Sequence, residues 1–350
     1  MKIALISDAW APQVNGVVRT LTVTTERLRA RGHDVRTITP DLFRTLPCPT
    51  YPEIRLALGA GRSVARTLTD FAPDAVHIAT EGPLGWAARG WCLREGRPFN
   101  TSLHTRFPDY VAARTRLPAE WFWRLLRQFH APAEKILVAT PRLAAEMAER
   151  GLTQTHIWSR GVDLARFSPN ALPLLAMTGL LRPIQLCVGR VAVEKNIEAF
   201  LQLETPGTKV IVGDGPALAS LRIRFPAAHF VGALHGEALA AAYAAADVFV
   251  FPSLTDTFGL VMIEALASGT PVAAFPVHGP LDVIGPDGTG VVPGWSTRIG
   301  AISPNLAEAV TAALTVNRAD CAAYARYFSW NAATDQFLAS IPPEPLQAAA

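Results

Sequence analysis

The chain has 350 residues, of which half are hydrophobic and 17% are charged. It is too apolar to be disordered and too long for one hydrophobic core, so we expect two domains. The net charge of +3 conceals an asymmetry, because residues 1–170 carry +8 and residues 171–350 carry −5. The basic half suggests an anionic partner, although a chance difference between solvated faces would give the same counts.

The first half alternates short apolar runs with helical patterns. Residues 2–7 (KIALIS) are such a run, and residues 17–32, which end in Gly32, have the spacing of a helix. Alternation of this kind is typical of a parallel α/β sheet and predicts a first domain over residues 1–168. Further apolar runs lie at residues 34–40, 74–79, 98–104 and 135–140.

A second series begins after a cluster of prolines at Pro169, Pro173 and Pro183, where we expect the linker. The second domain is predicted at residues 169–325 as another doubly wound α/β unit. Residues 326–350 contain a C-terminal helix that could cross back to the first domain. The β-rich runs of the second domain lie at residues 184–191, 208–215, 228–232, 247–252 and 270–276.

The cysteine pattern and the lack of long apolar stretches indicate the cellular location of the protein. The cysteines form no C-x-x-C pair, which fits reduced thiols better than disulfides or zinc. The N-terminus is too short for a signal peptide, and no stretch has the roughly 18 apolar residues that span a bilayer. We expect a protein of the cytosol or of a membrane surface. The cysteines are Cys48, Cys92, Cys187 and Cys321.

Several loops that follow predicted strands carry residues suited to anions. If the parallel sheets of the two predicted domains face each other, they leave a cleft at the carboxyl ends of their strands. Gly16 stands at the mouth of the first helix, where N–H groups can receive a phosphate, although a turn glycine is common there. Arg190 and Lys195 suit a diphosphate, the alternative being two solvated surface cations.

A carboxylate pair, Asp256 and Glu264, flanks Gly259, near which a helix is expected to begin. If the helix begins near Phe258, its first N–H groups point toward phosphate, and Glu264 lies about two turns in, able to accept from ribose hydroxyls. The alternative makes Asp256 an N-cap and Glu264 a solvated residue. We prefer the first interpretation because an unpaired carboxylate in the apolar run VMIEALA would be costly.

Together these segments resemble the retaining glycosyltransferases of family 4, which have the GT-B fold of two facing Rossmann-like α/β domains with an inter-domain cleft. The resemblance covers nearly the whole chain. In the first domain, HTRFPDY at residues 104–110 is similar to the mannosyltransferase and glycolipid-synthase branch. The other segments are GRVAVEKN at 189–196, VGDGP at 212–216, SRGVDLARF at 159–167 and the long run at 230–272.

The resemblance implies roles for these residues. The family's E-x7-E pair falls on Asp256 and Glu264, so Glu264 would hold the donor ribose and Asp256 would lie near the transferred sugar's hydroxyls. The first member is Asp here, one methylene shorter, which leaves the donor sugar open. Arg190 and Lys195 match the basic pair that neutralises the donor diphosphate, and Gly16 matches a loop glycine near the β-phosphate.

Further residues are assigned on the same resemblance. His104 would line the donor-sugar pocket, although outside this context a satisfied histidine at a strand end is the simpler interpretation. Arg160 is a weaker candidate, which could equally brace the linker. The phosphate and sugar cradle would be completed by the backbone of Thr257, Phe258, Gly259 and Leu260, and the nucleotide-base pocket would be edged by Gly213, Asp214 and Gly215, which alone are only a turn.

The resemblance implies a metal-independent reaction with no cofactor besides the nucleotide sugar, and the chain contains no D-x-D motif. The diphosphate leaving group would be stabilised by Arg190, Lys195 and helix N-termini. Retaining enzymes of this family are thought to work by same-face attack, with the donor phosphate taking the acceptor proton. We therefore assign no protein nucleophile.

Residues 106–130 mix five arginines with aromatic side chains, which suits an interface lying in anionic headgroups. The alternative is that Trp121, Leu125 and Phe129, spaced by four, form the buried stripe of a core helix. The first interpretation predicts a lipid acceptor and peripheral attachment to the inner face of the cell membrane. It involves no nucleic acid.

The predicted function is transfer of a hexose or hexuronic acid, with retention, from a UDP- or GDP-linked sugar to a lipid acceptor such as diacylglycerol or a lipid-linked glycan. One alternative is a soluble family 4 mannosyl- or glucosyltransferase acting on a polysaccharide or a small acceptor. Another is a nucleotide-sugar epimerase of the same fold. A nonenzymatic nucleotide-sugar binder is the third.

Overall fold

The computed structural model contains two compact units, and each is an α/β layer built on a six-stranded parallel sheet. The first unit comprises residues 1–160 with residues 330–350, and the second comprises residues 161–329. The structure describes residues 1–13, 15–48, 51–104, 118–172, 174–256 and 258–341.

The sheet of the first unit has the strand order β2-β1-β5-β6-β7-β8. The chain places β2 on one side of β1 and β5 on the other, so the topological switch point lies between β1 and β5. The strands are β1 (Lys2–Ile6), β2 (Asp34–Ile38), β5 (Ala75–Ile78), β6 (Asn100–Leu103), β7 (Ile136–Val138) and β8 (Thr155–Ile157), with a separate antiparallel hairpin of β3 (Thr45–Cys48) and β4 (Tyr51–Ala57).

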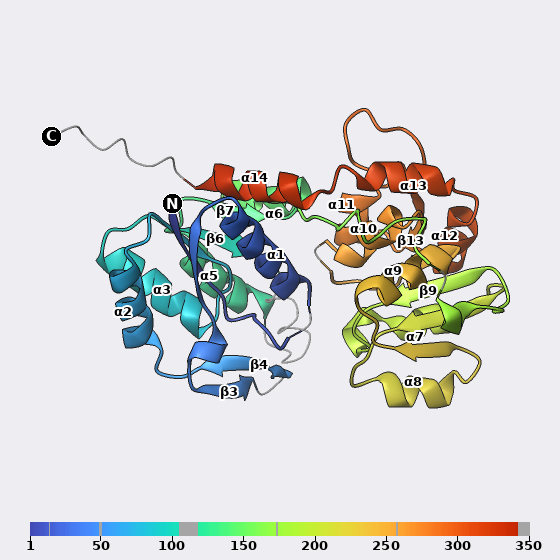
Figure 1. Ribbon diagram of the computed structural model, residues 1–350, viewed down its shortest axis with the longest axis horizontal. Coiled ribbons are helices and arrows are strands. Elements are labelled where there is room, and N and C mark those ends of the chain that lie inside the picture. The colour runs from blue at the N-terminus through green and yellow to red at the C-terminus, as the bar shows by residue number, and fades with distance from the viewer. Residues whose placement is uncertain (14, 49–50, 105–117, 173, 257, 342–350) are drawn as a thin grey trace. The chain divides into compact units, whose positions relative to one another are not determined.

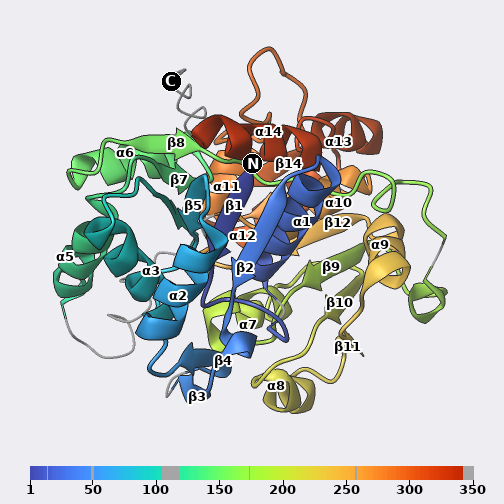
Figure 2. The same cartoon turned by 60° about the vertical axis from the view of Figure 1, so that its left-hand side comes forward.

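Helices cover both faces of this sheet because β1 is apolar on both sides. Ala4 and Ile6 belong to one core cluster, which α2, α3, α5 and α6 help to form, whereas Ile3 and Leu5 pack with residues of α1 and α14. Helices α1 and α14 lie side by side although they come from opposite ends of the chain (Figures 1 and 2). The helices are α1 (Gly16–Ala30), η1 (Pro40–Leu42), α2 (Gly61–Phe71), α3 (Pro83–Arg94), α5 (Ala119–His130), α6 (Pro141–Glu149) and α14 (Trp330–Ser340).

The sheet of the second unit has the order β11-β10-β9-β12-β13-β14, so its switch point lies between β9 and β12. Its strands are β9 (Ile184–Val188), β10 (Thr208–Val212), β11 (His229–Gly232), β12 (Val248–Phe251), β13 (Val272–Ala274) and β14 (Gly300–Ile302). Its helices are η2 (Leu175–Met177), η3 (Val193–Lys195), α7 (Ile197–Leu201), α8 (Leu218–Arg224), α9 (Gly236–Ala245), α10 (Leu260–Ala267), α11 (His278–Val283), α12 (Leu306–Ala313) and α13 (Arg318–Ala325).

The strands predicted from apolar runs are confirmed in both units, and four strands, β3, β4, β8 and β14, were not predicted. Strand β8 is only three residues long and half-buried, and β14 is a three-residue segment that begins with glycine. The hairpin of β3 and β4 stands outside the main sheet, and the first of its strands has no fully buried residue. None of these segments has the apolar run by which the sequence marks a buried strand.

The chain passes between the units at residues 160–161 and 329–330. The Val162 N–H donates to the Phe328 carbonyl at 2.9 Å, and the buried Phe167 ring lies 5.8 Å from that of Tyr243. These contacts tie residues 161–168, which the sequence analysis placed in the first domain, to the second unit. Among the described helices, none combines the length and apolar composition that a bilayer crossing requires.

Candidate functional site

In the second unit, the loop after β9 and the loop after β12 meet at the switch point of the sheet. The loop after β9 contains Arg190 and the short helix η3, which ends at Lys195. Asn196 follows with a φ of 52°, and its side-chain amide donates to the Pro252 carbonyl, at the end of β12, at 3.1 Å. This hydrogen bond holds Lys195 beside the loop that carries Asp256.

Lys195 and Asp256, both predicted site residues, form an ion pair. The Lys195 Nζ donates to the two carboxylate oxygens of Asp256 at 2.6 and 2.8 Å. Asp256 does not cap a helix, because α10 begins at Leu260 with Gly259 as its N-cap, so that alternative is wrong. The two residues are partly buried, which also excludes the solvated-cation interpretation for Lys195.

Arg190 also has a carboxylate partner, since its guanidinium is ion-paired with Glu194, which lies four residues later in η3. The group at the switch point therefore consists of two cations and two carboxylates. Its cations are balanced within the protein. A diphosphate would have to compete with Glu194 for Arg190 and with Asp256 for Lys195. The planar guanidinium of Arg190 favours the diphosphate in this competition, because it can donate two parallel hydrogen bonds to a phosphate.

The Gly213-Asp214-Gly215 loop packs against the Arg190 loop. A Cβ on Gly213 would lie 1.9 Å from the Gly189 carbonyl oxygen, and one on Gly215 would lie 2.5 Å from that of Val191. The Val191 N–H donates to the Asp214 carbonyl at 2.8 Å. The glycines are therefore required by a close backbone approach, which is more than the turn that the sequence alone indicated.

Helix α10 begins two residues later than predicted because Gly259 has a φ of 85°, outside the helical region. The Phe258 side chain is buried, with its ring 6.1 Å from that of Phe328, so only the backbone of Phe258 could line a cradle. Leu260 is the first helical residue, and Glu264 lies just over one turn in. Thr257 lies outside the described residues.

Glu264 is only 3% exposed, which makes the solvated-helix interpretation wrong. The hydroxyl of Tyr243, a fully buried residue of α9, donates to Glu264 Oε2 at 3.0 Å. Tyr243 was not among the residues predicted from the sequence. The feature of the sequence that could have indicated it is a single tyrosine in the alanine-rich run AAAYAAAD. A tyrosine buried in such a run requires a polar partner for its hydroxyl.

In the first unit, Gly16 is the first residue of α1, and the preceding Asn15 caps that helix by accepting from the Val18 N–H at 3.0 Å. His104 follows strand β6, and its Nδ1 lies 3.0 Å from Nη2 of Arg160. The structure thus brings His104 together with the weaker candidate Arg160.

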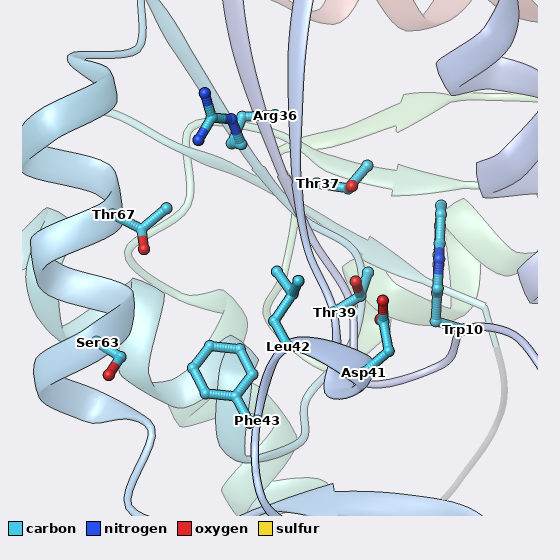
Figure 3. Close-up of a pocket in the computed structure, with 9 residues that line it drawn as sticks. All are labelled: Trp10, Arg36, Thr37, Thr39, Asp41, Leu42, Phe43, Ser63 and Thr67. Carbon is cyan, nitrogen blue, oxygen red and sulfur yellow. The ribbon is translucent and has the colours of Figure 1, made fainter.

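A cavity of about 520 Å³, which the sequence analysis missed, opens in the first unit beside the carboxyl end of β2. Ser63 and Thr67 line it from α2, and Trp10 stands on the opposite side (Figure 3). The sequence contains polar residues at intervals there, namely Arg36, Thr37, Thr39 and Asp41, from β2 into η1. The remaining lining residues are Arg36, Thr37, Thr39, Asp41, Leu42 and Phe43, a set that suits a hydroxylated ligand.

Helix α5 divides the proposed apolar stripe between two faces. Phe129 is fully buried with Trp123 and Leu126, but Trp121 is 62% exposed and Leu125 is 52% exposed. The interpretation of Trp121, Leu125 and Phe129 as one buried stripe is therefore wrong. Residues 105–117, which hold Arg106, Arg114 and Arg116, lie outside the described residues.

Comparisons with known proteins agree with this architecture. Residues 14–166 match the model of Glycosyltransferase Family 4, and residues 182–315 match that of Glycosyl transferases group 1. A GDP-mannose-dependent alpha-mannosyltransferase of Mycobacterium tuberculosis (strain CDC 1551 / Oshkosh) is 32% identical over 89% of this chain and 87% of its own. The chain belongs to glycosyltransferase family 4.

This glycosyltransferase is also similar to an alpha-monoglucosyldiacylglycerol synthase of Streptococcus pneumoniae (strain ATCC BAA-255 / R6), which is 26% identical over 78% of this chain and 71% of that protein. Among solved structures, a sucrose-phosphate synthase from Thermosynechococcus elongatus aligns with a TM-score of 0.74, at 23% identity, over 97% of this chain and 98% of that one. The fold of this glycosyltransferase is GT-B.

Proposed function

We propose that this glycosyltransferase moves a hexose or hexuronic acid, with retention, from a GDP- or UDP-linked sugar to a lipid acceptor such as diacylglycerol or a lipid-linked glycan. The observation that carries the proposal is the Arg190, Lys195 and Asp256 group at the switch point of the second unit. The names of the relatives, a GDP-mannose-dependent mannosyltransferase and a glucosyldiacylglycerol synthase, support the donor and acceptor classes.

In the proposed mechanism, Arg190 and Lys195 bind the donor diphosphate and stabilise the charge that grows on it as the glycosidic bond breaks. In this proposal Lys195 contacts the leaving phosphate while it stays beside Asp256, its ion-pair partner. Asp256 is assigned to the hydroxyls of the transferred sugar on the resemblance to family 4. The leaving phosphate takes the acceptor proton on the same face, which preserves the anomeric configuration. The two cations supply the stabilisation without a metal ion.

The proposal is tested with purified protein, a series of GDP- and UDP-sugars and a lipid extract. Thermal stabilisation identifies the donor, and NMR of the isolated product gives the anomeric configuration. A glycolipid with the configuration of the donor supports the proposal. Transfer only to soluble glycans would replace the acceptor class, and conversion of the donor without any acceptor would replace transfer by epimerisation.

The first prediction concerns the ribose contact. Glu264→Gln should weaken nucleotide binding by about tenfold or more, because a hydrogen bond to a charged group contributes roughly 1.5–3 kcal/mol. Tyr243→Phe should weaken it in the same direction by a smaller factor, since it removes the hydrogen bond that orients the carboxylate. Titration calorimetry with GDP and UDP measures both changes.

Tyr327→Phe is the matched control for Tyr243→Phe, because Tyr327 is an exposed tyrosine of the same unit. It should bind nucleotide as the parent protein does. Unchanged affinity in Glu264→Gln would remove Glu264 from the nucleotide site.

The second prediction concerns membrane attachment. We propose that helix α5 docks on anionic lipid of the inner membrane face through Trp121 and Leu125, with Arg124 on the same face. Arg127, which is ion-paired with Glu120, adds positive charge to a neighbouring face of the helix. Replacing Trp121 and Leu125 together by serine should lower binding to anionic vesicles at least tenfold, because each buried apolar side chain contributes about 1.5–3 kcal/mol. Arg124→Gln with Arg127→Gln should lower it less, at about 1 kcal/mol per charge.

Vesicle co-sedimentation with anionic and with neutral lipid measures these changes. Leu93→Ser is the control, since Leu93 is about half exposed on α3 of the same unit. Binding that survives the Trp121 and Leu125 replacements would contradict docking by α5. Co-sedimentation that does not depend on anionic lipid would favour a soluble transferase.

A further inference from the structure

Arg160 is a buried guanidinium in the first unit, and only 6% of its surface is exposed. Its Nη1 donates to the Trp158 carbonyl at 2.6 Å, and its Nη2 lies 3.0 Å from Nδ1 of His104. The guanidinium carbon also lies 5.1 Å from the centroid of the Trp158 ring. The two amino groups of one planar fork thus contact a backbone carbonyl and an imidazole ring.

The chemistry of this contact determines where the proton of His104 lies. A guanidinium has donors and no acceptor, so the Nδ1 of His104 must accept the hydrogen bond. A neutral imidazole whose Nδ1 accepts carries its proton on Nε2. A protonated ring would place an N–H against an N–H and bring two positive charges together.

Among the described residues, burial and two neighbouring side chains oppose protonation of His104. Burial, the charge of Arg160 and the neighbouring His77 all lower the pKa of His104 well below its ordinary value. His77, on β5, is itself kept neutral, because burial lowers its pKa to about 3. Its Nε2 is engaged with the Ser102 hydroxyl at 2.7 Å, and the Trp158 ring packs edge-on against both histidines.

We infer that Arg160 is a positioning residue that holds His104 as the neutral tautomer protonated on Nε2, so that His104 acts as a hydrogen-bond donor and not as a general acid or base. The identity of its acceptor, a hydroxyl or ring oxygen of the donor sugar, rests on the proposed function. The tautomer itself does not. A lysine could not replace Arg160 fully, because an ammonium lacks the planar fork that contacts both acceptors.

The tautomer can be measured directly on the intact protein. With ¹⁵N-labelled histidine rings, NMR distinguishes a protonated Nδ1 from a protonated Nε2, and the His104 signals are assigned by their loss in His104→Gln. We expect an Nε2-protonated ring that stays neutral from pH 5.5 to 8. An Nδ1-protonated ring or an imidazolium at pH 7 would overturn the inference.

Arg160→Met should allow both tautomers and move the titration of His104 toward its ordinary value. Arg160→Lys keeps a cation and serves where the methionine variant fails to fold, and in it we expect a mixture of tautomers. A ring that stays entirely Nε2-protonated in a folded variant without the guanidinium would show that Arg160 does not set the tautomer. These outcomes need no substrate, so they remain decisive if the proposed donor is wrong.

Turnover supplies a second readout once a donor is known. The glutamine amide can replace an Nε2–H donor but cannot act as a base, so His104→Gln should retain about tenfold more activity than His104→Ala. In Arg160→Met, the kcat/KM profile should gain an acid limb that the parent lacks. Equal activity of His104→Gln and His104→Ala would contradict a donor role.

Discussion

Replacing Lys195 by alanine should lower kcat about a hundredfold, the loss typical of removing one group that stabilises charge in a transition state. The same loss is expected for Arg190→Ala. Both cations lie in the loop after the carboxyl end of β9, one of the two strands that form the switch point of the second unit, where ligands of such sheets bind. Steady-state kinetics with saturating donor and acceptor measures the effect.

The ion pair of Lys195 with Asp256 requires a further variant, because Lys195→Ala also leaves that carboxylate without its cation. If the only role of Lys195 were to neutralise Asp256, combining Lys195→Ala with Asp256→Asn would restore activity. We expect the double variant to remain slow, because neither replacement restores a cation for the leaving diphosphate.

Arg222→Ala serves as the control for loss of a cation, since Arg222 is exposed on α8 of the same unit. It should leave kcat unchanged. Near-native rates in both Arg190→Ala and Lys195→Ala would remove the diphosphate role and, with it, the proposed mechanism.

Phe337→Ala should lower the free energy of unfolding by about 3–5 kcal/mol, the range for truncating a fully buried aromatic ring. Phe337 is 0% exposed on α14, and its ring lies 4.9 Å from that of His77 and 5.2 Å from that of Trp158. The last helix therefore completes the core of the first unit. Urea unfolding followed by tryptophan fluorescence measures the change.

Asp335→Ala is the control on the same helix, because Asp335 is exposed and forms a surface ion pair with Arg31. Such pairs contribute about 0–1 kcal/mol. A loss below 1 kcal/mol in Phe337→Ala would mean that α14 is not part of the core.

Much of the fold could be predicted from local pattern. The run KIALIS is apolar on both faces, which marks a strand buried in a parallel sheet, and β1 is buried in this way. The order of such runs also carries the resemblance to family 4, which the comparisons confirm. Strands without an apolar run, such as β8 and β14, left no signal that could be read.

The candidate site was predictable residue by residue but not pair by pair. The sequence indicated Lys195 and Asp256 as separate polar groups in loops, and the fold joins them across 61 positions. Likewise, Arg160 contacts His104 across 56 positions. The Glu264 carboxylate was recognised as costly to bury unpaired, yet its partner Tyr243 was not recognised.

Elements could be predicted and side-chain pairs could not, because the interactions that determine them act over different distances along the chain. Apolar periodicity and loop composition act within a few residues, so the sequence by itself determined the element types, the two α/β units and the family. Which side chains meet depends on the order in which strands join a sheet and on how helices pack over it. Only the tertiary structure therefore decided that Arg190 and Lys195 are paired with carboxylates, and that the buried Arg160 contacts His104.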